Sequence, residues 1–232
     1  MGRSLPSNVG ITVSAKTRSD TLVEFFAGLG VNSPNTKFQF IESSEKQIDD
    51  VNRVFVRDTA KAWYQLGAPP CAQSVGDLCQ ELKHIIADSG ATKVVFVGSS
   101  MGGFAAILYS ALLGIGSAIA FSPQTFVGPL NRLAYGDFRW SRELGKTWVR
   151  SFRRDSCWDL LPVLRRKQPP VGSTVYYAAR HRLDRAHAMR LAEVPNVNLV
   201  GIEGQDHNIV RAVRDTDRLR GVLEQHASGV LR

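Results

Sequence analysis

The stretch that decides the fold is VVFVGSSMGGFAAILYSALLG, residues Val94–Gly114. It begins with four apolar residues, passes through a turn rich in Gly and Ser, and continues as an apolar run of small residues. A continuous apolar strand is typical of a parallel sheet that is buried on both faces, and the second half has the length of a buried helix. We therefore expect a strand-to-helix turn at residues 98–102. Such a turn can be a plain connection, a phosphate-binding loop or a bend that carries a nucleophile.

The turn reads Gly98-Ser99-Ser100-Met101-Gly102, which fits the pattern G-x-S-x-G. A serine on a sharp bend between a strand and a helix needs a strained backbone, and glycine two residues away on either side relieves the crowding. The bend would expose the Ser100 hydroxyl and place the backbone N–H of Met101 at the start of the helix, where a developing oxyanion is stabilised. This pattern predicts Ser100 as a nucleophile and Met101 as an oxyanion donor.

A phosphate-binding loop is the main alternative for the same turn. A Walker A loop ends in Gly-Lys-Ser or Gly-Lys-Thr, and no lysine lies between positions 93 and 146. The glycines at 98, 102 and 103 do not have the spacing of G-x-G-x-x-G. The residues therefore favour a nucleophile over a phosphate site, with a Gly-Ser turn of no chemistry as the remaining alternative.

Apolar β-branched runs alternate with helical patterns on both sides of this turn, which indicates an α/β fold with a mostly parallel central sheet and helices on both faces. The stretch TAKAWYQLG (59–67) reads as a short helix or turn. Strands are expected at 10–15, 21–28, 37–42, 52–58, 92–98, 117–123, 173–179 and 196–203. Helices are expected at 74–87, 103–114, 185–194 and 208–225.

Residues 124–170 break the alternation and predict a helical lid inserted into a single domain that spans residues 1–232. Three of the four tryptophans fall here, Trp140, Trp148 and Trp158. Residues 132–167 hold ten basic and four acidic side chains, a surplus of six in a chain whose net charge is +8. The surplus is either a solvated helical surface or a patch for an anionic partner. No nucleic-acid-binding motif accompanies it, so we expect no nucleic-acid partner.

The base that a serine nucleophile needs is predicted from chain order. On a fold of this kind the serine is followed by the acid and then by the histidine, each in a loop after a strand. His84 precedes Ser100, and His226 lies near the chain end, which leaves three candidates. His207 directly follows the last expected strand, so we predict it as the general base. His187 would lie on a helix and is expected to be structural.

The acid that orients the base should follow the preceding strand. Asp184 lies five residues beyond Ala179, just before an expected helix, so it can cap that helix and also hold His207. Asp206, Asp155 and Asp159 are the alternatives. The turn FFAGLG, residues 25–30, is the candidate source of the second oxyanion donor, because glycines let the backbone approach the site, and we predict the N–H of Leu29 for this role.

These segments together resemble an α/β-hydrolase. The resemblance rests on VVFVGSSMGGFAAILYSALLG, AIAFSPQT, YYAARHRLDRAHAMRL and GQDHNIV, and the early FAGLG and VFVRDTAKAWYQLG extend it over most of residues 21–225. The chain is similar to small bacterial serine hydrolases associated with polysaccharide biosynthesis and export. That resemblance implies a triad of Ser100, Asp184 and His207, with Met101 and Leu29 as oxyanion donors and without a metal or organic cofactor. It departs from the family where His-Gly is usual, because Ala27-Gly28 stands there.

The residues predict a serine hydrolase that cleaves a carboxylic ester through an acyl-enzyme. The expected substrate is a small-molecule or glycan acyl ester, such as an acylated sugar or an anionic compound. An acyltransferase or a peptidase with the same triad is one alternative, since the sequence does not fix the acceptor. The other is a binding module without catalysis that docks an acidic partner through its basic insertion. The sequence does not predict an oligomeric state.

Composition and the length of the apolar runs predict the compartment of the protein. The chain has 232 residues, 44% of them hydrophobic, as in a globular protein. Its apolar runs are shorter than the roughly 18 residues that a membrane span needs, and MGRSLPSNVG lacks the apolar segment of a secretory signal. The three cysteines, Cys71, Cys79 and Cys157, have no C-x-x-C spacing. We therefore expect a cytoplasmic protein with no stable membrane insertion, disulfide framework or zinc site.

Overall fold

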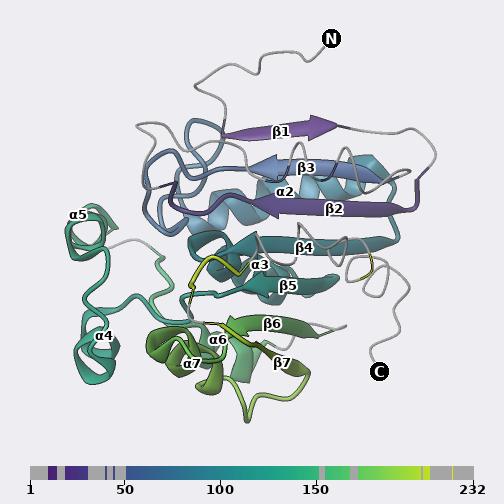
Figure 1. Cartoon of the computed structure of the whole chain (residues 1–232). Helices are drawn as coiled ribbons and strands as arrows, with labels where there is room; N and C mark the ends of the chain where they lie inside the picture. Colours follow the sequence, from purple (N-terminus) through teal and green to yellow (C-terminus); the bar gives the residue numbers. More distant parts are fainter. Residues whose placement is uncertain are drawn as a thin grey trace.

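The computed structural model describes residues 10–14, 19–30, 40, 44, 51–151, 155–167, 172–204, 206–209 and 221. Within these residues, seven strands form one sheet in the order β1-β3-β2-β4-β5-β6-β7 (Figure 1). Strand β1 runs antiparallel to β3, and all other neighbouring strands are parallel. The strands are β1 (Ile11–Ser14), β2 (Thr21–Phe26), β3 (Asn52–Val56), β4 (Lys93–Ser99), β5 (Ser117–Phe121), β6 (Ser173–Ala178) and β7 (Val197–Ile202).

Both faces of this sheet are buried. Alternate residues such as Leu22, Phe26 and Phe96 share one core with helices α2 (Val75–Ser89), α3 (Met101–Leu113), α6 (Leu160–Arg166) and α7 (Arg182–Met189). The intervening residues, among them Val23 and Phe25, form a second core on the opposite face. The mostly parallel, doubly covered sheet predicted from the sequence is therefore confirmed.

The described residues that pack on the second face include Phe40 and Ile209. Most of the strand expected at 37–42 and of the helix expected at 208–225 lies outside the described residues.

Helix α2 shows how the local sequence sets an element. Its N-cap is Ser74, whose Oγ accepts a hydrogen bond from the N–H of Asp77 at 3.0 Å, and it ends at Gly90, which has a φ of 64°. Val75, Leu78, Leu82 and Ile86 make the buried stripe that the periodicity predicts.

Helix α7 begins three residues before its predicted start at residue 185. His181 caps it, because its Nδ1 accepts a hydrogen bond from the N–H of Asp184 at 3.2 Å. Histidine is not among the residues that usually signal an N-cap, so the sequence pattern placed the boundary too late. The regular helix also ends earlier than predicted, at Met189.

The described part of residues 124–170, the segment predicted to be an insertion, includes the helices α4 (Pro129–Tyr135), α5 (Ser141–Ser151) and α6. The tryptophans of this segment, Trp140, Trp148 and Trp158, are partly buried and pack against the core that α2 and α3 share with the sheet. Trp148 and Trp158 also meet edge to face at 6.5 Å, and the guanidinium of Arg132 lies 5.6 Å from the Trp148 ring centre. Helix α6 packs on α3, whereas α4 and α5 lie beyond the carboxyl ends of the parallel strands (Figure 1). No helix among the described residues has both the length and the apolar character needed to cross a membrane.

The strand order creates a switch point between β2 and β4. From β2 the chain moves outward to β3 and then returns to the other side of β2 to form β4. The loops that follow β2 and β4 therefore diverge at one place on the carboxyl edge, where open α/β sheets usually bind their ligands. Phe26, which ends β2, pairs with Gly98 in β4 and so brings the turn at 98–102 to this place.

Candidate active site

Ser100 forms the sharp bend between β4 and α3. Its φ of 54° and ψ of −115° are rare for any residue other than glycine. A Cβ atom on Gly98 would lie 2.1 Å from the carbonyl oxygen of Gly102, and a Cβ on Gly102 would lie 2.2 Å from the carbonyl oxygen of Phe26. Both glycines are therefore required by close backbone contacts, as the motif predicts. Ser100 itself is partly exposed, whereas Ser99 is buried in β4.

Three side chains from separate parts of the chain meet at this bend. His207, in the loop after β7, has its Nε2 atom 3.1 Å from the Ser100 Oγ. Its Nδ1 atom lies 2.7 Å and 2.9 Å from the two carboxylate oxygens of Asp184, in the first turn of α7. The structure thus brings together Ser100, Asp184 and His207, which lie up to 107 residues apart in the chain.

The charge on Asp184 fixes the direction of these hydrogen bonds. Burial raises the pKa of this carboxyl, but the hydrogen bond from His207 and the neighbouring charge of His207 outweigh burial, so the pKa of Asp184 lies below its usual value. An ionised carboxylate can only accept, so the proton of a neutral His207 lies on Nδ1. Its Nε2 lone pair is then free to accept the hydroxyl proton of Ser100.

Arg139, between α4 and α5, also contacts the candidate acid. Its Nη1 donates to Asp184 Oδ1 at 3.2 Å, while its Nε and Nη2 each donate to one oxygen of Asp137 at 2.9 Å. Burial lowers the pKa of Arg139, but the hydrogen bond and charge of Asp137, followed by the charge of Asp184, raise it overall. An arginine from the insertion therefore holds the Asp184 side chain in place with a permanent positive charge.

His187 belongs to a second buried pair rather than to the first. Its Nε2 lies 2.9 Å from Asp137 Oδ2, and its Nδ1 accepts the N–H of Thr125 at 3.1 Å. Burial lowers the pKa of His187 despite the opposing effect of Asp137, which favours a neutral ring with its proton on Nε2. The structural role predicted for His187 agrees with these contacts. Asp137 joins His187 to Arg139, so this buried pair helps to hold the guanidinium that contacts Asp184.

A loop at residues 58–67 contributes a buried carboxylate, Asp58, and a tryptophan, Trp63, to the surroundings of Ser100. Asp58 is fully buried and accepts the N–H groups of Ala60 and Tyr64, both at 2.9 Å, as well as that of Ala62. The loop carries Trp63, whose indole Nε1 donates to the Gln124 Oε1 at 2.8 Å.

Gln124 follows β5 and lies beside the candidate nucleophile, because its Oε1 is 3.5 Å from the Ser100 Oγ. The sequence pattern at 59–67 predicts a short helix or turn and does not single out Trp63 or Gln124 as site residues. The place of Gln124 directly after a parallel strand was the available signal.

The two predicted oxyanion donors lie on the loops that follow the paired strands β2 and β4. Met101 is the first residue of α3, whose leading N–H groups have no partner within the helix. Leu29 is buried two residues after Ala27, and Ala27 is anchored by its N–H to the Val56 carbonyl at 2.9 Å and by its carbonyl to the Tyr64 hydroxyl at 2.8 Å. The role of both N–H groups remains a prediction.

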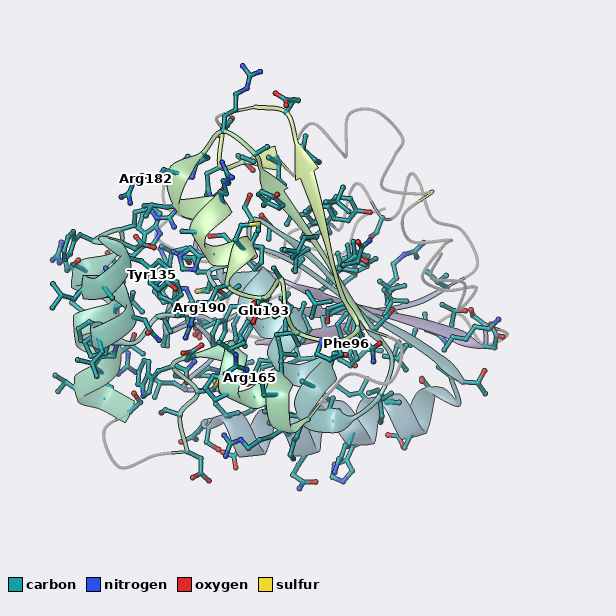
Figure 2. All side chains as sticks on the ribbon, turned by 90° about the horizontal axis from the view of Figure 1, so that it is seen from below. Phe96, Tyr135, Arg165, Arg182, Arg190 and Glu193 are labelled. Carbon is teal, nitrogen blue, oxygen red and sulfur yellow. The ribbon has the colours of Figure 1, made fainter. Side chains whose placement is uncertain are left out.

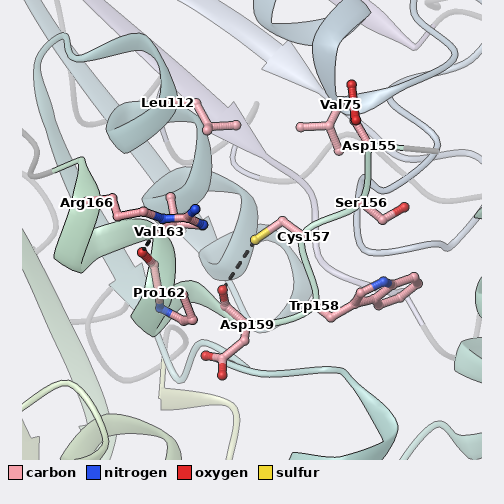
Figure 3. A pocket seen from close by; sticks show the side chains of 10 residues that line it. All are labelled: Val75, Leu112, Asp155, Ser156, Cys157, Trp158, Asp159, Pro162, Val163 and Arg166. Carbon is pink, nitrogen blue, oxygen red and sulfur yellow. Dashed lines mark hydrogen bonds between the residues drawn. The ribbon is translucent and has the colours of Figure 1, made fainter. Parts of the chain in front are cut away.

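The alternative acids have other contacts. Asp206 accepts the N–H of Asn208 at 2.8 Å, and Asp159 caps α6 by accepting the N–H of Leu161 at 3.0 Å. Asp155 lines a separate cavity of about 520 Å³ between the insertion and the ends of α2 and α3 (Figure 3). Cys157 also lines that cavity, and burial raises its thiol pKa to about 11, so it is a protonated thiol near neutral pH.

His181, Asp184 and His207 also have their donor atoms within 4.8 Å of one another, a set that could ligate a metal. These atoms are already committed to internal contacts. The Nδ1 of His181 accepts the Asp184 N–H at 3.2 Å, and the Arg139 guanidinium donates to the Asp184 carboxylate at 3.2 Å. We therefore assign no metal to this group.

Comparison with solved structures places the fold among known enzymes. A capsule O-acetyltransferase of Neisseria meningitidis serogroup A matches with a TM-score of 0.68 and 15% identity, over 93% of this chain and 91% of that one. MenH from S. aureus matches with a TM-score of 0.63 and 14% identity, over 94% and 97% of the two chains.

MGS-M2, an α/β hydrolase from a Medee basin deep-sea metagenome library, matches with a TM-score of 0.59 and 12% identity, over 97% and 95%. At these identities the likeness establishes the α/β-hydrolase fold. No curated protein matches the sequence. The sequence does match the family described as "Uncharacterised protein family (UPF0227)" over residues 44–199, about two thirds of the chain, and the chain belongs to that family.

Proposed function

We propose that this protein is a serine hydrolase that cleaves a carboxylic ester through a covalent acyl-enzyme. The observation that carries the proposal is the chain of contacts from Ser100 Oγ to His207 Nε2 at 3.1 Å and from His207 Nδ1 to Asp184 at 2.7 Å. A hydroxyl, an imidazole and a buried carboxylate in this order are the parts that nucleophilic catalysis by serine requires. The strained backbone at Ser100 supports the same assignment.

In the proposed acylation step, Ser100 Oγ attacks the acyl carbon while His207 Nε2 takes the hydroxyl proton. The carbonyl oxygen becomes an oxyanion, which the N–H groups of Met101 and Leu29 would stabilise. The tetrahedral intermediate then breaks its bond to the leaving oxygen, and His207 returns the proton to that alcohol. Asp184 holds the imidazole and stabilises its positive charge during the step.

In the deacylation step, water takes the place of the alcohol. His207 removes a proton from the water, the hydroxide attacks the acyl carbon, and Ser100 leaves as the protonated hydroxyl. The products are a carboxylic acid and the free enzyme. Every proton moves through His207, so the reaction as proposed needs no group beyond these side chains and the backbone N–H donors.

We also propose that residues 124–170 form a cap on a single domain and hold the site together. Arg139 belongs to this segment and contacts Asp184 at 3.2 Å, and Gln124 at its start lies 3.5 Å from Ser100 Oγ. An acyl ester of a sugar or of an anionic small molecule remains the proposed substrate class, because the segment is basic and carries three tryptophans.

Acyl transfer to an alcohol is the second candidate. It is favoured by the match to a capsule O-acetyltransferase with a TM-score of 0.68 over 93% of this chain. The acyl-enzyme would be the same, and an acceptor hydroxyl would replace water in the second step. Product analysis after adding an alcohol acceptor separates the two reactions. An acylated acceptor formed faster than free acid would support transfer.

The test of the hydrolase proposal is the turnover of p-nitrophenyl acetate by the wild-type chain, His207→Ala and His84→Ala. His84 lies on the exposed surface of α2 and serves as the matched control. We expect His207→Ala to lose activity by about a thousandfold or more, as removal of a general base does, and His84→Ala to keep it. Equal turnover by wild type and His207→Ala would contradict the proposal.

A further inference from the structure

Exposed apolar side chains gather on the helices α4 and α5. Within the described part of the chain, seven large hydrophobic side chains are exposed, and five of these are Leu130, Leu133, Tyr135, Phe138 and Val149. Leu130 is 81% exposed and Leu133 69%, so these side chains contribute little to the core of the domain. Single exposed leucines are common, but a cluster within twenty residues marks an interaction surface.

The spacing of these residues puts them on coherent helix faces. Leu130 and Leu133 are three residues apart and share the outer face of α4. On α5 the exposed residues Arg142, Lys146 and Val149 are spaced four and three apart and also share one face, with Arg150 beside them. The surface therefore combines an apolar helix with a basic one.

The charge of this surface is mainly positive. Residues 129–151 are all described, and their exposed side chains are seven apolar or aromatic residues, three cations and one serine, while Glu143 on α5 is half-buried. We define the α4–α5 surface as Pro129, Leu130, Leu133, Ala134, Tyr135, Phe138, Ser141, Arg142, Lys146, Val149 and Arg150. We propose that the α4–α5 surface docks the protein onto an anionic lipid bilayer.

The location of the surface fits a peripheral contact. Figure 1 shows α4 and α5 at the outer side of the molecule, beyond the carboxyl ends of the strands. Arg182 of α7 donates to the carbonyl oxygens of Tyr135 and Gly136 at 3.3 Å and 3.4 Å, which fixes the end of α4. Figure 2 shows Arg182 and Tyr135 on the same side of the molecule. Phe138 is next in the chain to Arg139, which contacts Asp184. Docking through this surface would bring the candidate active site close to the lipid.

The combination of groups favours a bilayer over other partners. Apolar side chains enter the boundary between head groups and acyl chains, while neighbouring cations attract anionic head groups. A second copy would bring the same three exposed cations of each α5 together, against one half-buried acid, Glu143, which opposes association. Nucleic-acid binding is driven by phosphate contacts and gains little from exposed aliphatic side chains. The occupant that uses both the leucines and the cations is an anionic lipid surface.

The test is co-sedimentation of the full chain with vesicles of phosphatidylcholine alone or mixed with phosphatidylglycerol. We expect binding to the mixed vesicles, weakened by added salt, and much weaker binding to phosphatidylcholine alone. Leu130→Asp with Leu133→Asp should abolish binding, because two carboxylates would enter the lipid boundary. Arg142→Gln with Lys146→Gln should weaken it by about fivefold for each cation removed.

The matched control is Arg165→Gln with Lys167→Gln, which removes two exposed cations at the end of α6 and should bind as wild type does. Circular dichroism and p-nitrophenyl acetate turnover of the leucine variant report whether it is folded. Absence of binding by the wild type to mixed vesicles would overturn the proposal. Binding of the folded leucine variant to mixed vesicles as tight as that of the wild type would also overturn it. A third contradicting result is a wild-type dimer in light scattering that the leucine variant disrupts, while that variant still binds vesicles.

Discussion

The conformation of Ser100 depends on two neighbouring backbone contacts. The carbonyl oxygen of Gly102 occupies the space where a Cβ of Gly98 would lie, and the carbonyl of Phe26 does the same for Gly102. The strained φ of 54° persists because strand β2, strand β4 and helix α3 all meet there. The single hydroxyl is thus held by backbone packing, and small changes in that packing should alter its position.

Gly102→Ala tests this steric requirement. The added methyl would lie 2.2 Å from the Phe26 carbonyl oxygen, so β2 and α3 must separate. We expect the free energy of unfolding to fall by about 2 kcal/mol or more and turnover of p-nitrophenyl acetate to be largely lost. Urea denaturation and an ester assay measure the two effects.

The control for this change is Gly145→Ala in α5, where a Cβ would have no neighbour within 4 Å. Alanine is a better helix former than glycine, so the control should gain up to about 1 kcal/mol in stability. Equal stability of the two alanine variants would contradict the steric account of the turn.

Arg139→Gln tests how the candidate acid is held. The hydrogen bond at 3.2 Å to Asp184 joins two charged groups, and such bonds contribute about 1.5–3 kcal/mol. We expect kcat to fall about ten- to a hundredfold with little change in KM, because Arg139 does not touch the substrate in the proposed reaction. Arg139→Lys should restore part of the loss by keeping the charge.

A merely structural role for Arg139 would not move the pH profile of kcat/KM. Loss of the guanidinium removes a permanent positive charge 3.2 Å from the Asp184 carboxylate, so we expect this pH profile to move. The exposed Arg142 provides the control, and Arg142→Gln should leave the profile in place. An unchanged profile and kcat in Arg139→Gln would exclude the positioning role.

At the scale of elements, the loop at 58–67 connects several parts of the site. Lys61, Trp63 and Tyr64 all have positive φ angles, between 51° and 57°, which the backbone hydrogen bonds to Asp58 stabilise. From this loop Trp63 fixes Gln124, and the Gln65 Oε1 accepts the N–H of Cys157 at 2.7 Å. One buried carboxylate therefore supports residues near Ser100 and in the insertion.

Asp58→Ala tests the importance of this loop. It would leave the N–H groups of Ala60, Ala62 and Tyr64 without their acceptor. The last two are buried, and each such loss costs about 1–3 kcal/mol. We expect the free energy of unfolding to fall by at least about 3 kcal/mol, with a lower kcat below the melting temperature because Gln124 loses its support. Asp88→Ala, on the exposed face of α2, is the matched control and should change neither quantity. A free energy of unfolding for Asp58→Ala equal to that of the wild type would contradict the supporting role of Asp58.

The sequence predicted elements well where periodicity is strong. The strands around β4 and the helix α2 lie within two residues of their predicted bounds, because their apolar patterns are set by burial. The start of α7 was wrong, because His181 caps it. Residues 59–67 were predicted as a short helix or turn, but the left-handed backbone there follows from the hydrogen bonds that Asp58 accepts, and no sequence pattern signals that role.

The candidate site was predictable in part, because chain order and strand ends can be read from the sequence. Chain order and strand ends were enough to bring Ser100, Asp184 and His207 together, since parallel strands present their carboxyl ends at one edge. The contact from Arg139 to Asp184 spans 45 residues and joins an insertion to a helix start. Such contacts depend on how helices pack in space, and a single sequence has no pattern that reports them.

At the scale of the whole molecule, Glu24 is a buried acid that makes stability depend on pH. It lies in the central strand β2, and in the described structure its carboxylate oxygens have no hydrogen-bond partner. Burial raises its pKa from 4.5 to about 8. Between these values the folded state keeps a proton that the unfolded state releases, so this group makes the protein less stable as pH rises from 4.5 to about 8.

Glu24→Gln should remove this dependence. The stability of the variant relative to wild type should rise with pH across that window, by at most about 1.4 kcal/mol per pH unit, and level off above about 8. Urea unfolding of both chains at a series of pH values measures the difference. Glu193→Gln, at an exposed position, should show no such trend. A stability difference between Glu24→Gln and wild type that does not vary with pH would show that Glu24 ionises normally.

The assignment of Ser100 as nucleophile is tested most directly by labelling with a fluorophosphonate probe and mapping the modified peptide by mass spectrometry. The adjacent Ser99 supplies a matched control within the same turn, since it is buried in β4. We predict one adduct on Ser100 in the wild type and in Ser99→Ala, greatly slowed labelling in His207→Ala, and none in Ser100→Ala. Labelling of Ser100→Ala at the wild-type rate, or an adduct mapped to another residue, would contradict the account.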